Sequence, residues 1–220
     1  MHISLIATYH AERGAVTASA LLAILERIQP VVVFAESSRT HVDVWEDGSL
    51  GTVESLAVAR YANTHSIDVV PVDSQLPASS FFEAWKETSR VIERTSPKYR
   101  HLIDLNTQRI CEGGFVYLNS DESNQAWADI YCEELETIEY CGDSRLRDTY
   151  AQVRDVNERR EQEMLRNIRA YCASATQTRC VFLVGAAHRK SLIEKISALG
   201  ETVTPRIEWD TAGSQVGSGA

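Results

Sequence analysis

Short apolar runs alternate with amphipathic stretches along the first third of the chain. Residues 3–7, 31–35 and 67–72 are aliphatic and β-branched runs of a length typical of buried strands. Between the first two runs, four apolar residues recur with the spacing of one helix face: Leu21, Ile24, Leu25 and Ile28. After a polar loop over 37–50, Gly51–Thr52 predicts the start of a second helix. This alternation of strands and helices predicts a parallel sheet with right-handed crossovers.

The middle of the chain, residues 78–176, has helical spacing almost throughout. A capping box at 80–83 predicts one helix start, and Ser96–Pro97 predicts another. Residues 113–118 are predicted as a glycine loop followed by a short strand, and residues 145–173 as a long, charge-rich helix. We therefore predict a large helical insertion in the fold.

The strand pattern returns near the carboxyl terminus. Residues 180–184 predict a fourth strand, and a helix follows it. Residues 203–209 predict a fifth strand, which Pro205 places at an edge of the sheet, as Pro71 does for the third strand. Residues 213–220 are small and polar and are predicted to be disordered.

Together these elements predict an α/β fold. Its central sheet is expected to be mostly parallel, with about five strands, flanking helices and a large helical insertion between the third and fourth strands. The continuous valine run at 31–33 fits a strand that is covered on both faces. Residues 1–212 are expected to form a single domain, with the insertion at about 78–176 and a tail at 213–220.

Composition narrows the function classes. Of the 220 residues, 44% are hydrophobic and 24% are charged, which is an ordinary balance for a globular protein. The formal net charge of −9 repels phosphate backbones, so we expect no nucleic-acid partner. No segment resembles a leader and no apolar run approaches the ~20 residues of a membrane span, so we expect a cytoplasmic protein without a membrane partner. The five cysteines form no C-x-x-C pair, which argues against a thiolate zinc site.

Polar side chains follow the predicted strands at their carboxyl ends. In strand order they are His10, Glu36, Asp73 and His188. Ligands of open α/β sheets bind outside these ends, so we expect the four side chains to converge. Imidazole and carboxylate are the usual ligands of a catalytic divalent ion, and the same groups can activate water without a metal. More ordinary roles remain open for Glu36, as a cap of the next loop, and for Asp73, as a turn residue.

Two near-copies of one short pattern contain the histidines. Residues 7–10 and 185–188 each place a small residue three positions before a histidine. A larger side chain at the small position would obstruct the turn or the approach of a ligand. Tyr9 is a candidate for lining the pocket. The other four histidines and the mixed charges of residues 154–169 are expected to face solvent.

At these residues the sequence resembles the TraB/Tiki/ChaN/erythromycin-esterase superfamily. Residues 7–10 are similar to the G-T-x-H motif of that family, with Ala7 in place of glycine, and residues 185–188 match the second motif, G-x-x-H. Three further segments resemble family motifs in the same order: the helix end at Gln29–Pro30 with the following strand and Glu36, the strand Val70–Asp73, and the helix segment Arg160–Asn167. The matches frame residues 3–200 and leave the middle helices unmatched.

The resemblance implies several activities and adds one site residue. Members of the superfamily include metal-dependent proteases, metal-independent macrolide esterases, haem-iron-binding lipoproteins and pheromone-inactivation proteins, so the fold alone does not select a reaction. The resemblance makes Arg160 a candidate guanidinium that binds a substrate carboxylate or the catalytic Glu36. A surface salt bridge is the alternative role for Arg160.

We therefore expect a hydrolase that cleaves peptide or ester bonds in a small-molecule or peptide substrate. The candidate catalytic residues are His10, Glu36, Arg160 and His188, and the candidate binding residues are Tyr9, Asp73 and Gly185. The two histidines and Glu36 would hold a divalent ion such as manganese, cobalt or zinc, or would activate water directly. Asp73 would support a histidine ring, and Arg160 would position substrate or stabilise negative charge. The alternatives are a protein that binds haem or a peptide without turnover, and a member without activity that binds a partner protein.

Overall fold

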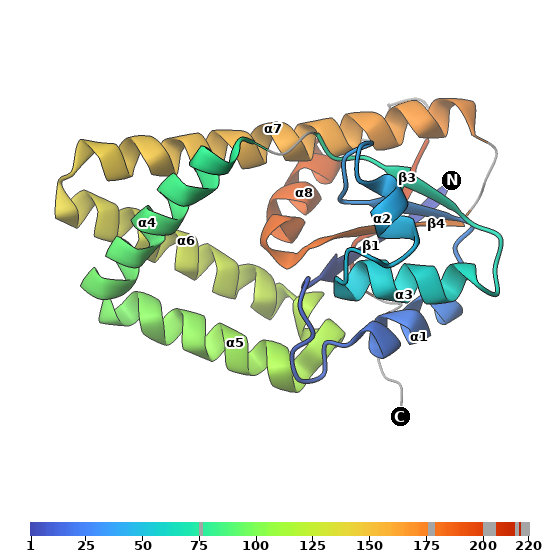
Figure 1. The fold of residues 1–220 in the computed structure, drawn as a ribbon, viewed down its shortest axis with the longest axis horizontal. Coiled ribbons are helices and arrows are strands. Elements are labelled where there is room, and N and C mark those ends of the chain that lie inside the picture. The colour runs from blue at the N-terminus through green and yellow to red at the C-terminus, as the bar shows by residue number, and fades with distance from the viewer. Residues whose placement is uncertain (75–76, 176–178, 200–205, 214–215, 217–220) are drawn as a thin grey trace.

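The computed structural model describes residues 1–74, 77–175, 179–199, 206–213 and 216. Within these residues, five parallel strands form one sheet in the order β3-β2-β4-β1-β5 (Figure 1). The strands are β1 (His2–Thr8), β2 (Val32–Ala35), β3 (Asp68–Pro71), β4 (Arg179–Gly185) and β5 (Glu208–Asp210). The predicted α/β fold with a parallel central sheet is confirmed.

Helices cover both faces of the sheet. They are α1 (Ala18–Ile28) and α3 (Val53–Ala62) on one face, and α7 (Ser144–Ser174) and α8 (Ala186–Leu199) on the other. Successive side chains of a strand point to opposite faces, so Leu5 of β1 packs in the cluster with α7 and α8 while Ile6 packs in the cluster with α1 and α3. The chain therefore leaves the neighbouring strands β1 and β4 toward opposite faces. This divergence opens a crevice at the carboxyl ends of the two strands.

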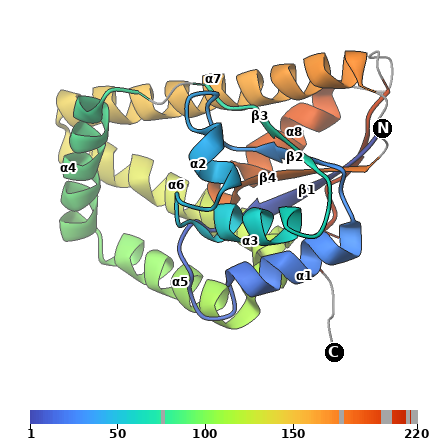
Figure 2. The same cartoon turned by 45° about the vertical axis from the view of Figure 1, so that its right-hand side comes forward.

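The predicted helical insertion between β3 and β4 is also confirmed. It consists of α4 (Ser79–Thr95), α5 (Pro97–Leu118), α6 (Asp121–Cys141) and the long helix α7. Ser96 caps α5 through its hydroxyl, with Pro97 at the first helical position, as the sequence predicts. Helices α4, α5 and α6 extend beyond the carboxyl ends of the strands, while α7 returns along the sheet (Figures 1 and 2).

One side chain of the insertion bonds directly to the sheet. Asn119, between α5 and α6, accepts a hydrogen bond from the backbone N–H of Ala7 at 2.8 Å and donates one to the carbonyl of Ala7 at 3.1 Å. Strand β5 pairs only with residues 2–4 of β1, so at Ala7 the amide of Asn119 takes the place of a neighbouring strand. The insertion is thereby fixed to the strand that leads to His10.

Two predictions about short segments, the loop at 37–50 and the capping box at 80–83, are wrong. The segment 37–50, predicted as a polar loop, contains the short helix α2 (Val42–Glu46), whose Trp45 is buried in the core. Its few apolar positions are too short a run to show a period. The capping box at 80–83 does not form, since α4 begins at Ser79 and has no side-chain cap at its N-terminus.

The strand predicted at 115–118 is wrong as well, and the predicted glycine loop is reduced to a break at Gly114. Helix α5 continues to Leu118 with a kink at Gly114, where φ is +54° and ψ is −140°. A Cβ on Gly114 would lie 3.0 Å from the Cβ of Ala15, so the glycine allows the kinked helix to pack on that loop. Phe115 and Leu118 are both buried at helical spacing.

The ends of the sheet agree with the proline-based predictions, because β3 and β5 are its outer strands. Residues 203–205 of the predicted fifth strand lie outside the described residues. Of the predicted tail, only Gly213 and Val216 are described, and Val216 is buried against the core on the α1 and α3 face. Within the described part of the chain, no helix combines the length and the apolar character needed to cross a bilayer.

Candidate functional site

A cavity of about 370 Å³ lies at the carboxyl ends of β1 and β2. Polar side chains in its wall include Thr8, His10, Glu36, Glu54, Asp73 and Arg160, and apolar side chains in its wall are Trp45, Leu50 and Leu183. The strand ends supply most of the polar groups, whereas α2 and the loop after it supply two of the apolar ones. A cavity of this size with a mixed lining fits a small organic ligand.

His10 is held by a buried carboxylate on α3. Its Nδ1 lies 2.9 Å from Oε1 of Glu54, which also accepts a hydrogen bond from the hydroxyl of Thr8. The hydrogen bond to Glu54 raises the pKa of His10 to about 9, although partial burial acts in the opposite direction. Burial alone would raise the pKa of Glu54, but the hydrogen bond and charge of His10 outweigh burial and lower it. The pair is therefore an imidazolium and a carboxylate at neutral pH.

The N-terminus of α3 places Glu54 beside His10. Thr52 and Ser55 form a reciprocal capping box, and the N–H of Val53 donates to the carbonyl of His10 at 2.9 Å. Glu54 thus lies in the first turn of the helix, where the helix dipole favours a negative charge.

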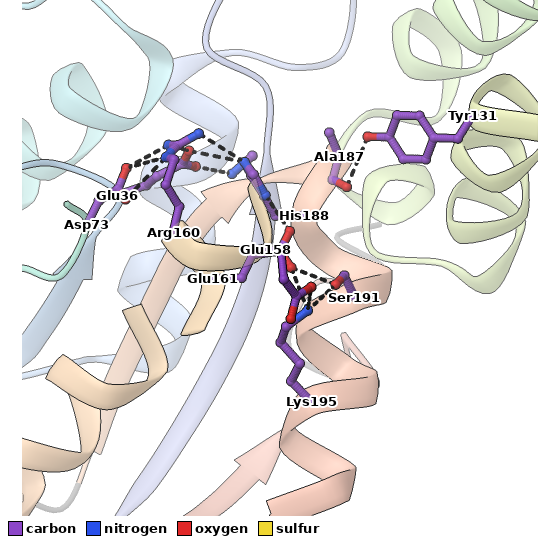
Figure 3. Close-up of polar contacts among 11 residues, drawn as sticks. Glu36, Asp73, Tyr131, Glu158, Arg160, Glu161, Ala187, His188, Ser191 and Lys195 are labelled. Atoms are coloured by element: carbon purple, nitrogen blue, oxygen red, sulfur yellow. Dashed lines mark hydrogen bonds and ion pairs between the residues drawn. The ribbon is translucent and has the colours of Figure 1, made fainter. Parts of the chain in front are cut away.

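Arg160 joins the two carboxylates that follow β2 and β3. Its guanidinium donates to both oxygens of Asp73, at 2.6 to 3.2 Å, and its Nη2 donates to Oε1 of Glu36 at 2.7 Å (Figure 3). All three side chains are largely buried, with 15% of Arg160, 10% of Glu36 and 3% of Asp73 exposed. A guanidinium between two carboxylates compensates the charges that burial would otherwise penalise.

The spacing of residues on α7 explains how Arg160 reaches the sheet. Arg160, Met164 and Asn167 recur at helical spacing, so they lie on one face of α7. Met164 is fully buried against the sheet, and Asn167 donates to the carbonyl of Val72 at 2.9 Å. The segment 160–167, which resembles a family motif, is therefore the part of α7 that packs over the end of β3.

His188 lies at the start of α8 on the other side of Arg160. Its Nδ1 is 2.7 Å from Oε1 of Glu161, and its Nε2 has longer contacts, 3.5 Å to Nη1 of Arg160 and 3.6 Å to Oε1 of Glu36 (Figure 3). The second oxygen of Glu161 accepts hydrogen bonds from Ser191 at 2.6 Å and Lys195 at 2.9 Å. Burial would raise the pKa of Glu161, but these partners outweigh burial and lower it, so the carboxylate stays ionised.

Gly185 leaves a methyl-sized position unfilled beside Glu36 and His10. Its backbone N–H donates to Oε2 of Glu36 at 2.6 Å, immediately before the N-terminus of α8. A Cβ at this position would lie 3.4 Å from Oε2 of Glu36 and 3.8 Å from Nε2 of His10. That a small residue is needed here for the approach of a ligand stays a prediction.

The predicted metal site is not formed. Among the residues that the structure describes, no three His, Cys, Asp or Glu side chains are grouped as a metal ion would require. Arg160 occupies the position between Glu36, Asp73 and His188 where a cation would be held. The donor set of His10, Glu36 and His188 therefore does not fit a divalent ion.

Two other predicted roles also change. Asp73 binds Arg160 and does not support a histidine ring, because the two histidines take Glu54 and Glu161 as partners. Tyr9 is not among the described residues that line the cavity, and its ring packs against the core and under the guanidinium of Arg13. The prediction that Arg160 binds Glu36 agrees with the structure.

Sequence reasoning missed the two carboxylates that hold the histidines. Glu161 was expected on a solvated helix face, yet it is 4% exposed, and Glu54 is 3% exposed. Each lies on the apolar stripe of its helix, Glu54 with Val58 and Glu161 with Leu165. A carboxylate on such a stripe signals a buried partner, and this signal was available in the sequence.

The comparisons with known proteins leave this site to be interpreted from its own geometry. The family resemblance therefore rests on the five motif segments alone, and each of them supplies one residue of the cavity or its supports: His10, Glu36, Asp73, Arg160 and His188. No family model, no curated protein and no solved structure matches the chain.

Proposed function

We propose that the protein hydrolyses carboxylic esters or amides, with Glu36 as general base and His10 as general acid. The observation that carries the proposal is the methyl-sized position that Gly185 leaves unfilled, where a Cβ would lie 3.4 Å from Oε2 of Glu36 and 3.8 Å from Nε2 of His10. A carboxylate and an imidazolium on two sides of one small space are the groups that water attack on a carbonyl needs.

The proton transfers follow from the charge of each group. A water molecule in the space would give a proton to Glu36 while its oxygen attacks the carbonyl carbon. When the C–O or C–N bond breaks, the imidazolium of His10 would protonate the leaving oxygen or nitrogen, and the proton on Glu36 would then return to His10. The pKa of about 9 for His10 supports this assignment, since the ring carries a proton at neutral pH.

His188 and Arg160 are assigned as positioning residues. Arg160 has its strong hydrogen bonds committed to Asp73 and Glu36, so it is poorly placed to bind a substrate carboxylate. His188 is 9% exposed and is not among the described residues that line the cavity. We therefore expect a substrate whose reacting part is neutral, with an apolar group against Trp45 and Leu50.

The proposal is tested by steady-state kinetics on p-nitrophenyl esters of increasing chain length and on the matching anilides. We expect His10→Gln and Glu36→Gln each to lower kcat/KM by about 10²- to 10⁴-fold, because each removes one proton-transfer group. His101→Gln, at an exposed position of α5, serves as the matched histidine control and should be unaffected. Equal rates in the wild type and both variants would contradict the proposal, as would the absence of turnover across the panel.

The same assay also tests whether the reaction needs a metal ion. Because the donors are not grouped around one point, we expect the rate to survive dialysis against EDTA. A rate that falls on dialysis and returns with added manganese, cobalt or zinc would contradict the assignment of Glu36 and His10.

A methyl group at Gly185 should separate activity from folding. In Gly185→Ala the new Cβ would make ordinary contacts at 3.4 Å and 3.8 Å, so we expect a change in the free energy of unfolding of less than about 1 kcal/mol. The same methyl would occupy the space assigned to water, so kcat/KM should fall by about 10²-fold. Urea unfolding and kinetics on one preparation check both parts. Unchanged kcat/KM would place the reacting water elsewhere.

A further inference from the structure

A second cavity lies between α6, α7 and α8. Its volume is about 290 Å³, and Trp127, Tyr131, Arg154, Lys190 and Glu194 form part of its wall. Glu161 also lines it, and Glu161 holds Nδ1 of His188. This second cavity therefore shares a wall residue with the support of the candidate site, although none of the residues lining the first cavity lines it.

The charged groups of the second cavity are unevenly paired. Glu158 and Glu161 both bind Lys195, at 2.7 and 2.9 Å. By contrast, Arg154, Lys190 and Glu194 take part in no ion pair with any residue that the structure describes. The guanidinium of Arg154 instead lies 4.9 Å from the centre of the Tyr131 ring. Two exposed cations and one exposed carboxylate are thus accessible to a ligand, and the charge of Arg154 also acts on the buried carboxylate of Glu134.

The aromatic part of the wall adds a surface for a side chain. Trp127 and Tyr131 lie with their ring centroids 5.9 Å apart on α6. The indole Nε1–H of Trp127 is buried and has no acceptor within the described part of the chain. The hydroxyl of Tyr131 donates to the carbonyl of Ala187 at 3.2 Å, which fixes this wall against the start of α8 (Figure 3).

We propose that the second cavity binds a small zwitterion, namely a free amino acid or a dipeptide. The carboxylate of the ligand would bind Arg154 and Lys190, its ammonium would bind Glu194, and its side chain would pack on the aromatic wall. The volume excludes a long peptide. A purely anionic ligand such as phosphate would leave Glu194 without a partner and would lie beside three carboxylates. The proposal does not depend on turnover at the first cavity.

Calorimetric titration of the full chain with each of the twenty amino acids and with glycylglycine tests the proposal. We expect at least one of these probes to bind with a Kd of about 1 mM or below. The N-acetyl and the carboxamide derivatives of the best probe should each bind about tenfold more weakly or worse, because each lacks one charge. Absence of saturable binding by every probe would overturn the proposal, and so would equally tight binding of inorganic phosphate.

Variants locate the binding. Arg154→Ala and Glu194→Gln should each weaken binding of the best probe by about tenfold or more. Arg159→Ala changes an exposed arginine of the same helix that pairs with Asp155 and should leave binding unchanged. His10→Ala should also leave it unchanged, because His10 lines only the first cavity. Binding that is lost in His10→Ala and kept in Arg154→Ala would assign the ligand to the first cavity and overturn the proposal.

Discussion

Replacement of Arg160 by methionine is expected to lower the free energy of unfolding by about 3–5 kcal/mol. The change would leave the carboxylates of Glu36 and Asp73 buried near each other without the guanidinium that binds both. Methionine keeps much of the aliphatic volume, so the loss measures mainly charge and hydrogen bonding. Urea unfolding at pH 7, followed by circular dichroism, gives the difference from the wild type.

Two further measurements identify the cause of the Arg160 effect. Arg159→Met, one position earlier on the exposed side of α7, should change stability by less than about 0.5 kcal/mol. Lowering the pH should reduce the deficit of Arg160→Met, because protonation removes the uncompensated negative charges. A deficit that stays constant from pH 7 to pH 4 would show that packing, and not charge, is what Arg160 contributes.

Replacement of Glu54 by glutamine is expected to move the titration of His10 from about 9 toward the ordinary value of 6.5. The hydrogen bond to Glu54 is the largest cause of the raised pKa, and Glu36 adds a smaller contribution. Proton NMR of the His10 ring, assigned by comparison with His10→Gln, measures the shift. Glu46→Gln, which changes an exposed carboxylate on α2, is the control that should leave the midpoint in place.

The same pair predicts the pH dependence of activity and of stability. As general acid, His10 is active when protonated, so kcat/KM should fall above about pH 9 in the wild type and at lower pH in Glu54→Gln. Because the folded pKa is raised, the stability contributed by His10 is complete below pH 6.5 and is lost as the pH rises through 9. The His10 side chain is 62% exposed, so this contribution should be about 1 kcal/mol or less. An activity limit that does not move in Glu54→Gln would remove His10 from the acid role.

The sheet could be predicted from sequence because its signals are local. The apolar run Val31–Ala35 indicates a buried strand by itself, and Pro71 indicates an outer strand, as the structure has it. Loop and helix ends were less predictable where tertiary packing decides them. The sequence near Gly114 predicts a loop. In the structure the glycine is needed because Ala15 packs closely against it.

The candidate site was predictable only in part for a related reason. His10, Glu36, Asp73 and His188 could be chosen because they follow strands, and their convergence follows from a parallel sheet. Which carboxylate holds which histidine could not be chosen, because tertiary packing decides where the helices of Glu54 and Glu161 lie. The predicted metal site is not formed for a similar reason. Tertiary packing places the guanidinium of Arg160 between Glu36 and Asp73, where it forms ion pairs.

The contact between Asn119 and Ala7 covers one edge of the sheet. Beyond Ser4, the side of β1 away from β4 has no strand partner among the described residues, and Asn119 binds the free backbone groups there. An uncovered strand edge is a template for pairing with another molecule. Ala7 and Asn119 are 112 positions apart in the sequence, so covering this edge depends on the docking of α5 and α6 against β1. In the folded structure the insertion therefore covers a strand edge that would otherwise be free to pair with another chain.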